Sequence, residues 1–266
     1  MKYNLVLFCT FISILVVAQN TEIGWYRTKD FNQKMLSKTS SLNLDKGLTA
    51  IHNKEWATCL AAFEKVIKED GYGAAQAGVN KAFCQFQLGN LVASIKTLEK
   101  AIKENQELKT AMASTLSDLY FKYGYNLIDE GKSLEAKTNL LHATIINPSN
   151  SQALSELSYM FAQEGNYEEC LSWAKKATEA NSKNSLAFSN LGLCYLGLKQ
   201  KASAVAAFSK ALALNSNFIA AYINRAAAYV TLKKCPQAIS DMDTAIKLDP
   251  SYTKSKSKIL ADCNGH

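Results

Sequence analysis

Residues 185–216 read SLAFSNLGLCYLGLKQKASAVAAFSKALALNS, and residues 218–250 read FIAAYINRAAAYVTLKKCPQAISDMDTAIKLDP. When the second stretch is aligned 34 positions after the first, similar residue types coincide. The coinciding pairs are Phe188 with Tyr222, Tyr195 with Tyr229, Ala204 with Ala238, Phe208 with Met242, and Ala211 with Ala245. A register kept over so many positions indicates a sequence repeat with a period of 34 residues.

The repeat predicts a pair of helices in each unit. We number the places in a unit from 1 to 34: places 4, 11 and 24 carry large side chains, and places 8, 20 and 27 carry small ones. Apolar residues recur at i, i+3, i+4 and i+7, which is typical of amphipathic helices. Small residues let two antiparallel helices approach closely, and large residues fill the space between them. Pro148 and Pro250, both at place 32, end the second helix of their units.

This pattern resembles the tetratricopeptide repeat, with a bulky–Leu–Gly–Tyr signature in helix A and an Ala–Phe–Ala–Pro signature in helix B. The resemblance implies an all-α fold: a right-handed superhelical solenoid of antiparallel helix pairs, about six repeats, with a C-terminal capping helix. The repeat array spans 40–252, and its predicted units are 40–73, 75–108, 117–150, 151–184, 185–218 and 219–252.

The match is weaker at the start of the array. In the first two units, Lys46, Ala50, Lys81 and Gln85 stand where Leu and Tyr are usual in helix A. An insertion of 8 residues separates units 75–108 and 117–150, and we expect it to lengthen the flanking helices.

The two ends of the chain differ from the array. Residues 1–18 combine Lys2, an apolar run and small residues at Val16 and Ala18, which is the pattern of a cleaved signal peptide. It predicts export to the periplasm, cell envelope or exterior, and no membrane span in the mature chain; an uncleaved anchor is the alternative. Residues 19–39 form an N-terminal extension or cap, and 253–266 a C-terminal capping helix and tail.

Composition and charge narrow the choice of partner. Only 3 Pro and 12 Gly exclude collagen-like and low-complexity chains. The net charge of +7 comes from 30 basic and 23 acidic residues that are interspersed along the chain. Because no basic stripe is present, the sequence predicts a protein or peptide partner, whose identity it does not give, and no nucleic acid.

The resemblance implies that places 2, 5, 6, 9, 12 and 13 of helix A line a concave, peptide-binding groove. Asparagine amides suit an extended peptide backbone, and an aromatic strip suits apolar side chains or a helix. For the aromatic residues, packing between adjacent A helices is the alternative. The candidate groove residues are Asn80, Phe83, Phe86, Phe121, Tyr125, Tyr159, Asn190 and Asn224.

The cysteines leave two interpretations open. Cys59 and Cys84 lie in helix B of one unit and helix A of the next, and Cys170 and Cys194 repeat that relation. Antiparallel neighbours of this kind can form disulfides in an oxidising compartment. The alternative is six free thiols, since cysteine also serves as a small apolar residue at place 20. Cys235 and Cys263 follow the relation more loosely.

The sequence shows no chemistry-bearing cluster. There is no CxxC motif and no Cys/His cluster, so no metal and no cofactor are expected. His52, His142 and His266 lie far apart in the array, and we expect no catalytic residues and no enzyme activity. The predicted function is a non-enzymatic interaction adaptor or scaffold outside the cytoplasm. The alternative is a structural subunit of a cell-envelope or secretion assembly that uses its ends or convex face.

Overall fold

The computed structural model describes residues 38–69 and 74–264. The predicted signal peptide, residues 1–18, and nearly all of the predicted extension at 19–39 lie outside the described residues.

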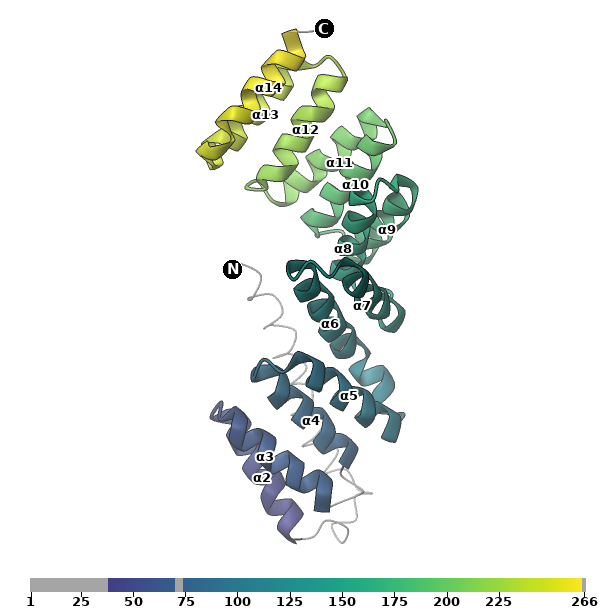
Figure 1. Cartoon of the computed structure of the whole chain (residues 1–266), viewed down its shortest axis with the longest axis vertical. Helices are drawn as coiled ribbons and strands as arrows, with labels where there is room; N and C mark the ends of the chain where they lie inside the picture. The colour runs from purple at the N-terminus through teal and green to yellow at the C-terminus, as the bar shows by residue number, and fades with distance from the viewer. Residues whose placement is uncertain (1–37, 70–73, 265–266) are drawn as a thin grey trace. The chain divides into compact units, whose positions relative to one another are not determined.

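The described residues form α-helices in consecutive packed pairs and no strand, which confirms the predicted all-α helix-pair fold (Figure 1). The first helices of the pairs, helices A, are α2 (Lys38–His52), α4 (Ala74–Gln87), α6 (Leu108–Asp129), α8 (Ser151–Gln163), α10 (Ser185–Gly197) and α12 (Ile219–Thr231). The second helices, helices B, are α3 (Trp56–Glu69), α5 (Leu91–Glu104), α7 (Ser133–Ile146), α9 (Tyr167–Ala180), α11 (Lys201–Leu214) and α13 (Cys235–Leu248). A 3-10 turn, η1 (Pro250–Tyr252), and the terminal helix α14 (Thr253–Asn264) follow.

The chain divides into two compact units, 1–126 and 127–266, called unit 1 and unit 2 below. The division falls within α6, which has 22 residues, whereas α8, α10 and α12 have 13 each. The inserted residues near position 110 are therefore helical and lengthen α6 at its N-terminal end.

Complementary side-chain size holds helix A against helix B within each pair. Places 20 and 24 of the B helices are buried throughout the array; at place 24, for example, Phe63 and Phe208 are fully buried. A Cβ added to Gly47 would lie 2.8 Å from the Phe63 ring, and one added to Gly192 would lie 2.6 Å from the Phe208 ring. Each glycine therefore leaves the space that the facing phenylalanine occupies.

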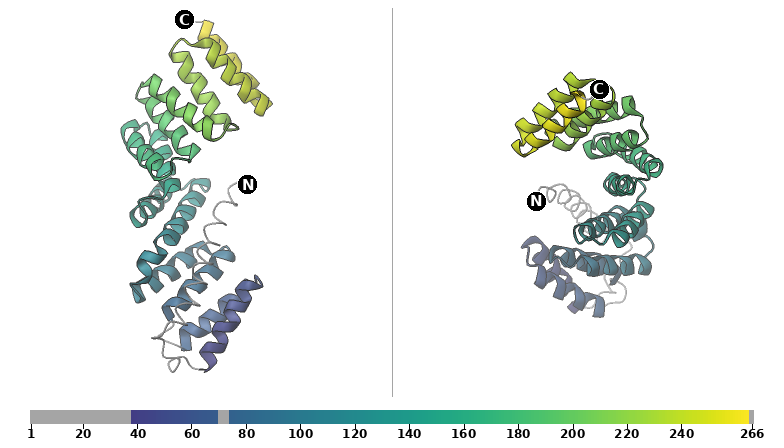
Figure 2. Two further views of the ribbon diagram at one scale, coloured as in Figure 1. Left: turned by 180° about the vertical axis from the view of Figure 1, so that it is seen from behind. Right: turned by 45° about the horizontal axis from the view of Figure 1, so that its top comes forward.

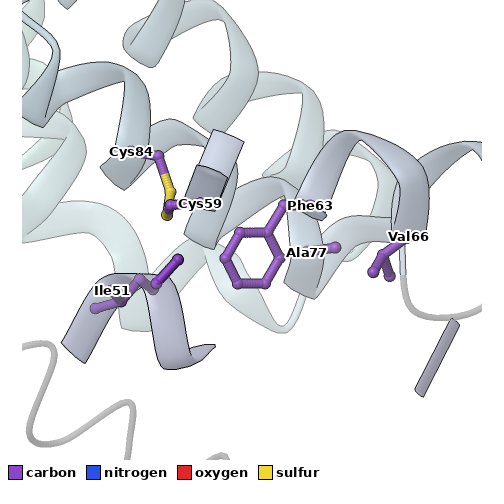
Figure 3. Packing of buried hydrophobic residues seen from close by; sticks show 7 residues of the cluster. Ile51, Cys59, Phe63, Val66, Ala77 and Cys84 are labelled. Atoms are coloured by element: carbon purple, nitrogen blue, oxygen red, sulfur yellow. A yellow bond between two sulfur atoms is a disulfide. The ribbon is translucent and has the colours of Figure 1, made fainter. Parts of the chain in front are cut away.

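The unit 1 core shows how this packing continues between pairs (Figure 3). Phe63 of α3 is clustered with Ile51 of α2 and with Ala77 of α4, beside the disulfide that joins Cys59 to Cys84. The partly buried rings of Trp56 and Phe83 pack against the same cluster. Helix B is therefore shared between its own helix A and the next one.

Every A-to-B turn has a left-handed residue at place 15. The following N–H closes the turn by donating to the carbonyl five residues back, as from Asn166 to Phe161 at 2.9 Å and from Gln200 to Tyr195 at 2.8 Å. Glycine serves three turns, and lysine, which is strained there, serves the other three. The six residues are Lys54, Gly89, Gly131, Gly165, Lys199 and Lys233, with φ between 58° and 81°.

Five of the B helices, α5, α7, α9, α11 and α13, end in a common way at place 31. There the side-chain oxygen of an Asn or Asp accepts a hydrogen bond from the backbone N–H two residues later, at 2.9–3.1 Å. The backbone N–H of the same residue donates to the alanine carbonyl at place 27. The five residues are Asn105, Asn147, Asn181, Asn215 and Asp249. For Asp249, the bond from Ser251 lowers the pKa of the carboxyl group.

In unit 2 the A helices form one layer: α10 contacts both α8 and α12 (Figure 2, green to yellow). The terminal helix α14 packs on α12 and α13, where Ile259 joins a cluster with Ala226, Val230 and Met242. Lys256 of α14 also forms an ion pair with Asp243 of α13. Helix α14 therefore covers apolar surface that a further repeat would otherwise have to cover.

Candidate binding face on the A helices

One side of each A helix in unit 2 is left uncovered by the B helices. Its residues follow the i, i+4, i+7, i+11 spacing of a single helical face and are partly or fully exposed. We call this surface the unit 2 A face. Its members are Gln152, Glu156, Tyr159 and Gln163 of α8, Leu186 and Leu193 of α10, and Ala220, Asn224, Ala227 and Thr231 of α12. Tyr159 is 41% exposed, so its ring is available to a ligand.

Glu156 is the one acidic residue of the three A helices of unit 2. Its side chain is only partly exposed, and burial raises the pKa of its carboxyl group to about 7. Desolvation of the carboxyl group by burial is the cause of this shift. Glu156 occupies place 6, the same place as Asn190 and Asn224.

Asn190 does not belong to the exposed face, which corrects the sequence prediction. It is 2% exposed, and its amide nitrogen donates to the carbonyl oxygen of Ser155 at 2.8 Å. Serine at position 155 is small enough to let the Asn190 side chain reach the neighbouring helix. Place 6 lies at the border between the exposed face and the contact with the preceding A helix. The Asn190 side chain is part of that contact and not of the exposed face. Asn224 remains partly exposed.

The Asn190 bond belongs to a group of hydrogen bonds among polar residues where α8 meets α9 and α10. Ser155 donates to the carbonyl of Ser151 at 2.6 Å, and Ser151 donates to the carbonyl of Ala177 at 3.0 Å. Asn184, which caps α10, donates to the hydroxyl oxygen of Ser151 at 2.8 Å. Satisfied in this way, the network fixes the register of α8 against α10.

In unit 1 the candidate residues divide between packing and surface. Asn80 and Phe121 were predicted to line the groove, but both are buried, with 7% of their surface exposed. This corrects the prediction for these two residues. Phe83 packs edge-on against Trp56, at 5.7 Å between ring centroids. Phe83 and Phe121 therefore serve in packing, which was the alternative to binding for the aromatic residues.

Phe86 and Tyr125 remain partly exposed in unit 1. The ammonium group of Lys122 lies 4.9 Å from the centre of the Phe86 ring, and the Tyr125 ring lies 6.1 Å from that of Phe121. Tyr159, by contrast, lies in unit 2. Of the predicted aromatic strip, Phe86 and Tyr125 are therefore partly exposed in unit 1, and Tyr159 is exposed in unit 2.

Arg225, the one basic residue of the same three helices, is already bound within the protein. It donates two hydrogen bonds to the Asp241 carboxylate, at 2.7 and 2.8 Å, and a third to the Ser209 hydroxyl. The bond to Asp241 raises the pKa of the guanidinium group further. The rings of Tyr222 and Tyr229 lie 5.7 and 5.8 Å from the guanidinium carbon. Arg225 thus joins α11, α12 and α13.

The structure joins the six cysteines of the described residues in three disulfides. Cys59 joins Cys84 between α3 and α4, and Cys170 joins Cys194 between α9 and α10, with Cα–Cα distances of 6.1 and 5.6 Å. A third disulfide joins Cys235 of α13 to Cys263 of α14, at 5.8 Å. Each one links a helix B to the helix that follows it.

Two further features bear on the kind of site. Across residues 38–69 and 74–264, no group of three or more His, Cys, Asp or Glu side chains is arranged to hold a metal ion. In the same ranges, no helix has the length and hydrophobicity needed to cross a membrane.

Glu156 lies at one of the places that the resemblance assigned to the groove, although it was not selected as a candidate residue, whereas Arg225 was not assigned to the groove. Glu156 stands at place 6, where the asparagines were selected. For Arg225, the sequence gives no sign that Asp241 would neutralise it, because that pairing depends on how α12 meets α13.

Comparison with known proteins agrees with the geometry. The sequence profile of the tetratricopeptide repeat matches residues 185–218, and no curated protein sequence matches the chain. Among solved structures, the C-terminal part of a TPR repeat-containing protein from Cytophaga hutchinsonii is 19% identical, with a TM-score of 0.54 over 82% of this chain and 83% of that one. YrrB, described as a TPR protein with an unusual peptide-binding site, is 20% identical, with a TM-score of 0.53 over 71% of this chain and 93% of its own.

Paired helices in tandem, with a layer of A helices left open on one side, define an α-helical repeat protein of the solenoid class. The sequence match at 185–218 is to the tetratricopeptide repeat, and the chain shares its fold with TPR proteins, in agreement with the resemblance found in the sequence.

Proposed function

We propose that this protein is a non-enzymatic adaptor that binds an extended peptide segment of a partner protein on the A helices, outside the cytoplasm. The observation that carries the proposal is the unit 2 A face: ten residues on three adjacent helices are partly or fully exposed, and Tyr159 among them is 41% exposed. Exposed aromatic residues on a rigid scaffold are typical anchors for a partner. The similar fold of YrrB, which has a peptide-binding site, supports this use of the architecture.

A peptide-display selection tests the proposal. Random heptapeptides are selected on the immobilised protein, and the affinity of the selected peptides is measured for the wild type and for the double variant Tyr159→Ala, Asn224→Ala. We expect the variant to bind at least about tenfold more weakly, because an aromatic anchor and an amide are lost. Unchanged affinity would show that the unit 2 A face is not the binding surface.

The second candidate is a structural subunit that uses a helix B surface. Its support is on α7, where Leu134 is 80% exposed and Ile145 is 76% exposed. The double variant Leu134→Ser, Ile145→Ser serves as the matched test in the same selection. A loss of binding confined to this variant would favour the second candidate over the adaptor.

Export is the remaining part of the proposal. Its support is the signal pattern of residues 1–18, and the three disulfides are consistent with an oxidising compartment. Fusing residues 1–30 to alkaline phosphatase, which is active only where its own disulfides form, tests it in a bacterial host. We expect phosphatase activity from the fusion and no activity when residues 5–18 are deleted. An inactive full fusion, or a deletion that stays active, would refute export by this segment.

A further inference from the structure

The A helices of unit 2 carry very few charged side chains. Helices α8, α10 and α12 contain one acidic residue, Glu156, and one basic residue, Arg225. Two hydrogen bonds between Arg225 and Asp241 neutralise that cation inside the protein. The carboxylate of Glu156 is thus the uncompensated charge of the layer.

The surroundings of Glu156 favour a cation as its partner. Gln152 and Tyr159 stand one turn before and one turn after it on the same side of α8, so their side chains are its neighbours. Tyr159 is 41% exposed and carries an aromatic ring that can bind a cation, and Gln152 carries an amide oxygen. Partial burial raises the carboxyl pKa to about 7, so a bound cation would favour the ionised form.

We propose that Glu156 and Tyr159 form a subsite that binds the side chain of a lysine or arginine in the partner peptide. The ammonium or guanidinium group would pair with the Glu156 carboxylate, and its alkyl stem or charged end would lie on the Tyr159 ring. The neighbouring positions of the peptide would meet uncharged surface, formed by Leu186, Leu193 and Ala227. This inference rests on the proposed function, since it specifies which peptides the unit 2 A face selects.

Peptide pools with one fixed residue test the subsite. Five pools of N-acetylated, C-amidated heptapeptides carry Lys, Arg, Gln, Leu or Glu at the centre and random uncharged residues elsewhere. Each is passed over the immobilised protein at pH 8, above the raised pKa of Glu156, and the retained peptide is measured by mass spectrometry. We expect the Lys and Arg pools to be retained about five- to tenfold more than the Gln pool.

Two variants separate this subsite from general charge attraction. Glu156→Gln keeps the side-chain shape and should make retention of the Lys and Gln pools equal. Glu168→Gln, at an exposed position of α9, removes the same charge elsewhere and should leave the preference unchanged. Tyr159→Phe should keep the preference, and Tyr159→Ala should reduce it, since the ring and not the hydroxyl receives the cation.

The outcomes distinguish this inference from the function on which it rests. If the wild type retains the Gln and Leu pools as well as the Lys pool, peptide binding stands and the cationic subsite is refuted. A Lys preference that persists in Glu156→Gln refutes it as well. If no pool is retained above a blank surface, both the subsite and the proposed function on the unit 2 A face are refuted.

Discussion

The side chain of Asn190 donates a hydrogen bond of 2.8 Å to the backbone carbonyl of Ser155, 35 residues earlier in the chain. Asn190 is 2% exposed, so water does not replace this bond if it is lost. The Asn190 side chain therefore stabilises the contact between α10 and α8, and it is not exposed for binding a ligand.

Asn190→Leu should consequently lower the free energy of unfolding by about 0.5–1.5 kcal/mol, because a buried hydrogen bond between α10 and α8 is lost while the Ser155 carbonyl keeps the Ser158 hydroxyl as a donor. Urea unfolding followed by circular dichroism measures the change. Asn224→Leu is the control at the same place of the next repeat; as a partly exposed residue, it should change stability by less than about 1 kcal/mol. Equal effects of the two substitutions would contradict the structural role of Asn190.

The lysines at place 15 predict an unusual stabilisation by glycine. Lys199 has a φ of 59°, in the left-handed region that costs a non-glycine residue about 1–2 kcal/mol. Lys199→Gly relieves this strain, and the greater freedom of glycine in the unfolded chain offsets about half of the gain. We expect a net increase of about 0.5–1 kcal/mol in the free energy of unfolding.

The converse substitution completes that test. Gly165 occupies place 15 of the preceding unit with a φ of 74°, and open space surrounds the position of an added Cβ. Gly165→Ala should therefore cost about 1 kcal/mol through the backbone alone. A stabilised Gly165→Ala, or a destabilised Lys199→Gly, would show that turn conformation does not set these preferences.

The Asn and Asp residues at place 31 should act as local stop signals for the B helices. The Asn181 side chain accepts from the N–H of Lys183 at 2.9 Å, in the turn between α9 and α10. Asn181→Ala should lower stability by about 0.5–1.5 kcal/mol, and Asn181→Asp should retain most of it because the oxygen acceptor remains. Thermal unfolding of the two variants provides the comparison; the idea fails if they are equally destabilised.

Glu156 predicts a pH-dependent stability. Its native pKa of about 7 lies above that of an unfolded chain, so the native state binds the proton more tightly. The contribution of protonated Glu156 to the free energy of unfolding is fully present below the pKa of glutamate in the unfolded chain. It is lost as the pH rises to the native pKa of about 7. Glu156→Gln should therefore equal the wild type near pH 4.5 and exceed it by about 1–3 kcal/mol at pH 8.

Urea unfolding of both proteins at several pH values checks this expectation, and groups common to both cancel in the difference. Glu168→Gln, which removes an exposed carboxylate from α9, is the control variant. A stability difference between Glu156→Gln and the wild type that stays constant from pH 4.5 to 8 would contradict the assigned burial of the carboxylate.

The disulfides predict a large response to reduction. Each closes a loop of 24 to 28 residues, and a loop of that length is worth about 3 kcal/mol through the unfolded chain. We expect Cys170→Ala with Cys194→Ala to lower stability by about that amount in oxidising buffer and to remove most of the response of α9 and α10 to dithiothreitol, measured by hydrogen exchange. If the Cys170→Ala, Cys194→Ala variant is as stable as the oxidised wild type, the disulfide between these residues does not stabilise the protein.

Much of this fold could be predicted from the period of 34 residues. Small and large residues alternate at fixed places, and the structure packs Gly192 against Phe208 as that pattern requires. The left-handed turns were predictable only in part, because glycine marks them at 89, 131 and 165, whereas Lys199 gives no signal. The stop signal at place 31 was present in the sequence as a recurring Asn or Asp.

The candidate site was harder to predict, since place 6 lies at the edge of a contact. Whether its side chain faces outward depends on the neighbouring helix: Asn190 reaches Ser155 across a serine-lined contact, while Asn224 and Glu156 stay partly exposed. Spacing assigns a residue to one side of its helix. It does not give the distance to the next helix, and that distance decides whether an amide binds a partner or a backbone.

The three disulfides also determine how the molecule would respond to a pulling force applied at its two ends. Each bridge joins one helix to the next, so the residues between its two cysteines carry none of the tension. The segments that can be drawn out are those between the bridges, including residues 85–169 and 195–234, and the pair α9–α10 keeps its link at any extension that leaves the sulfur–sulfur bond intact. Stretched between two attachments, the oxidised chain would behave as an extensible tether with three fixed-length segments.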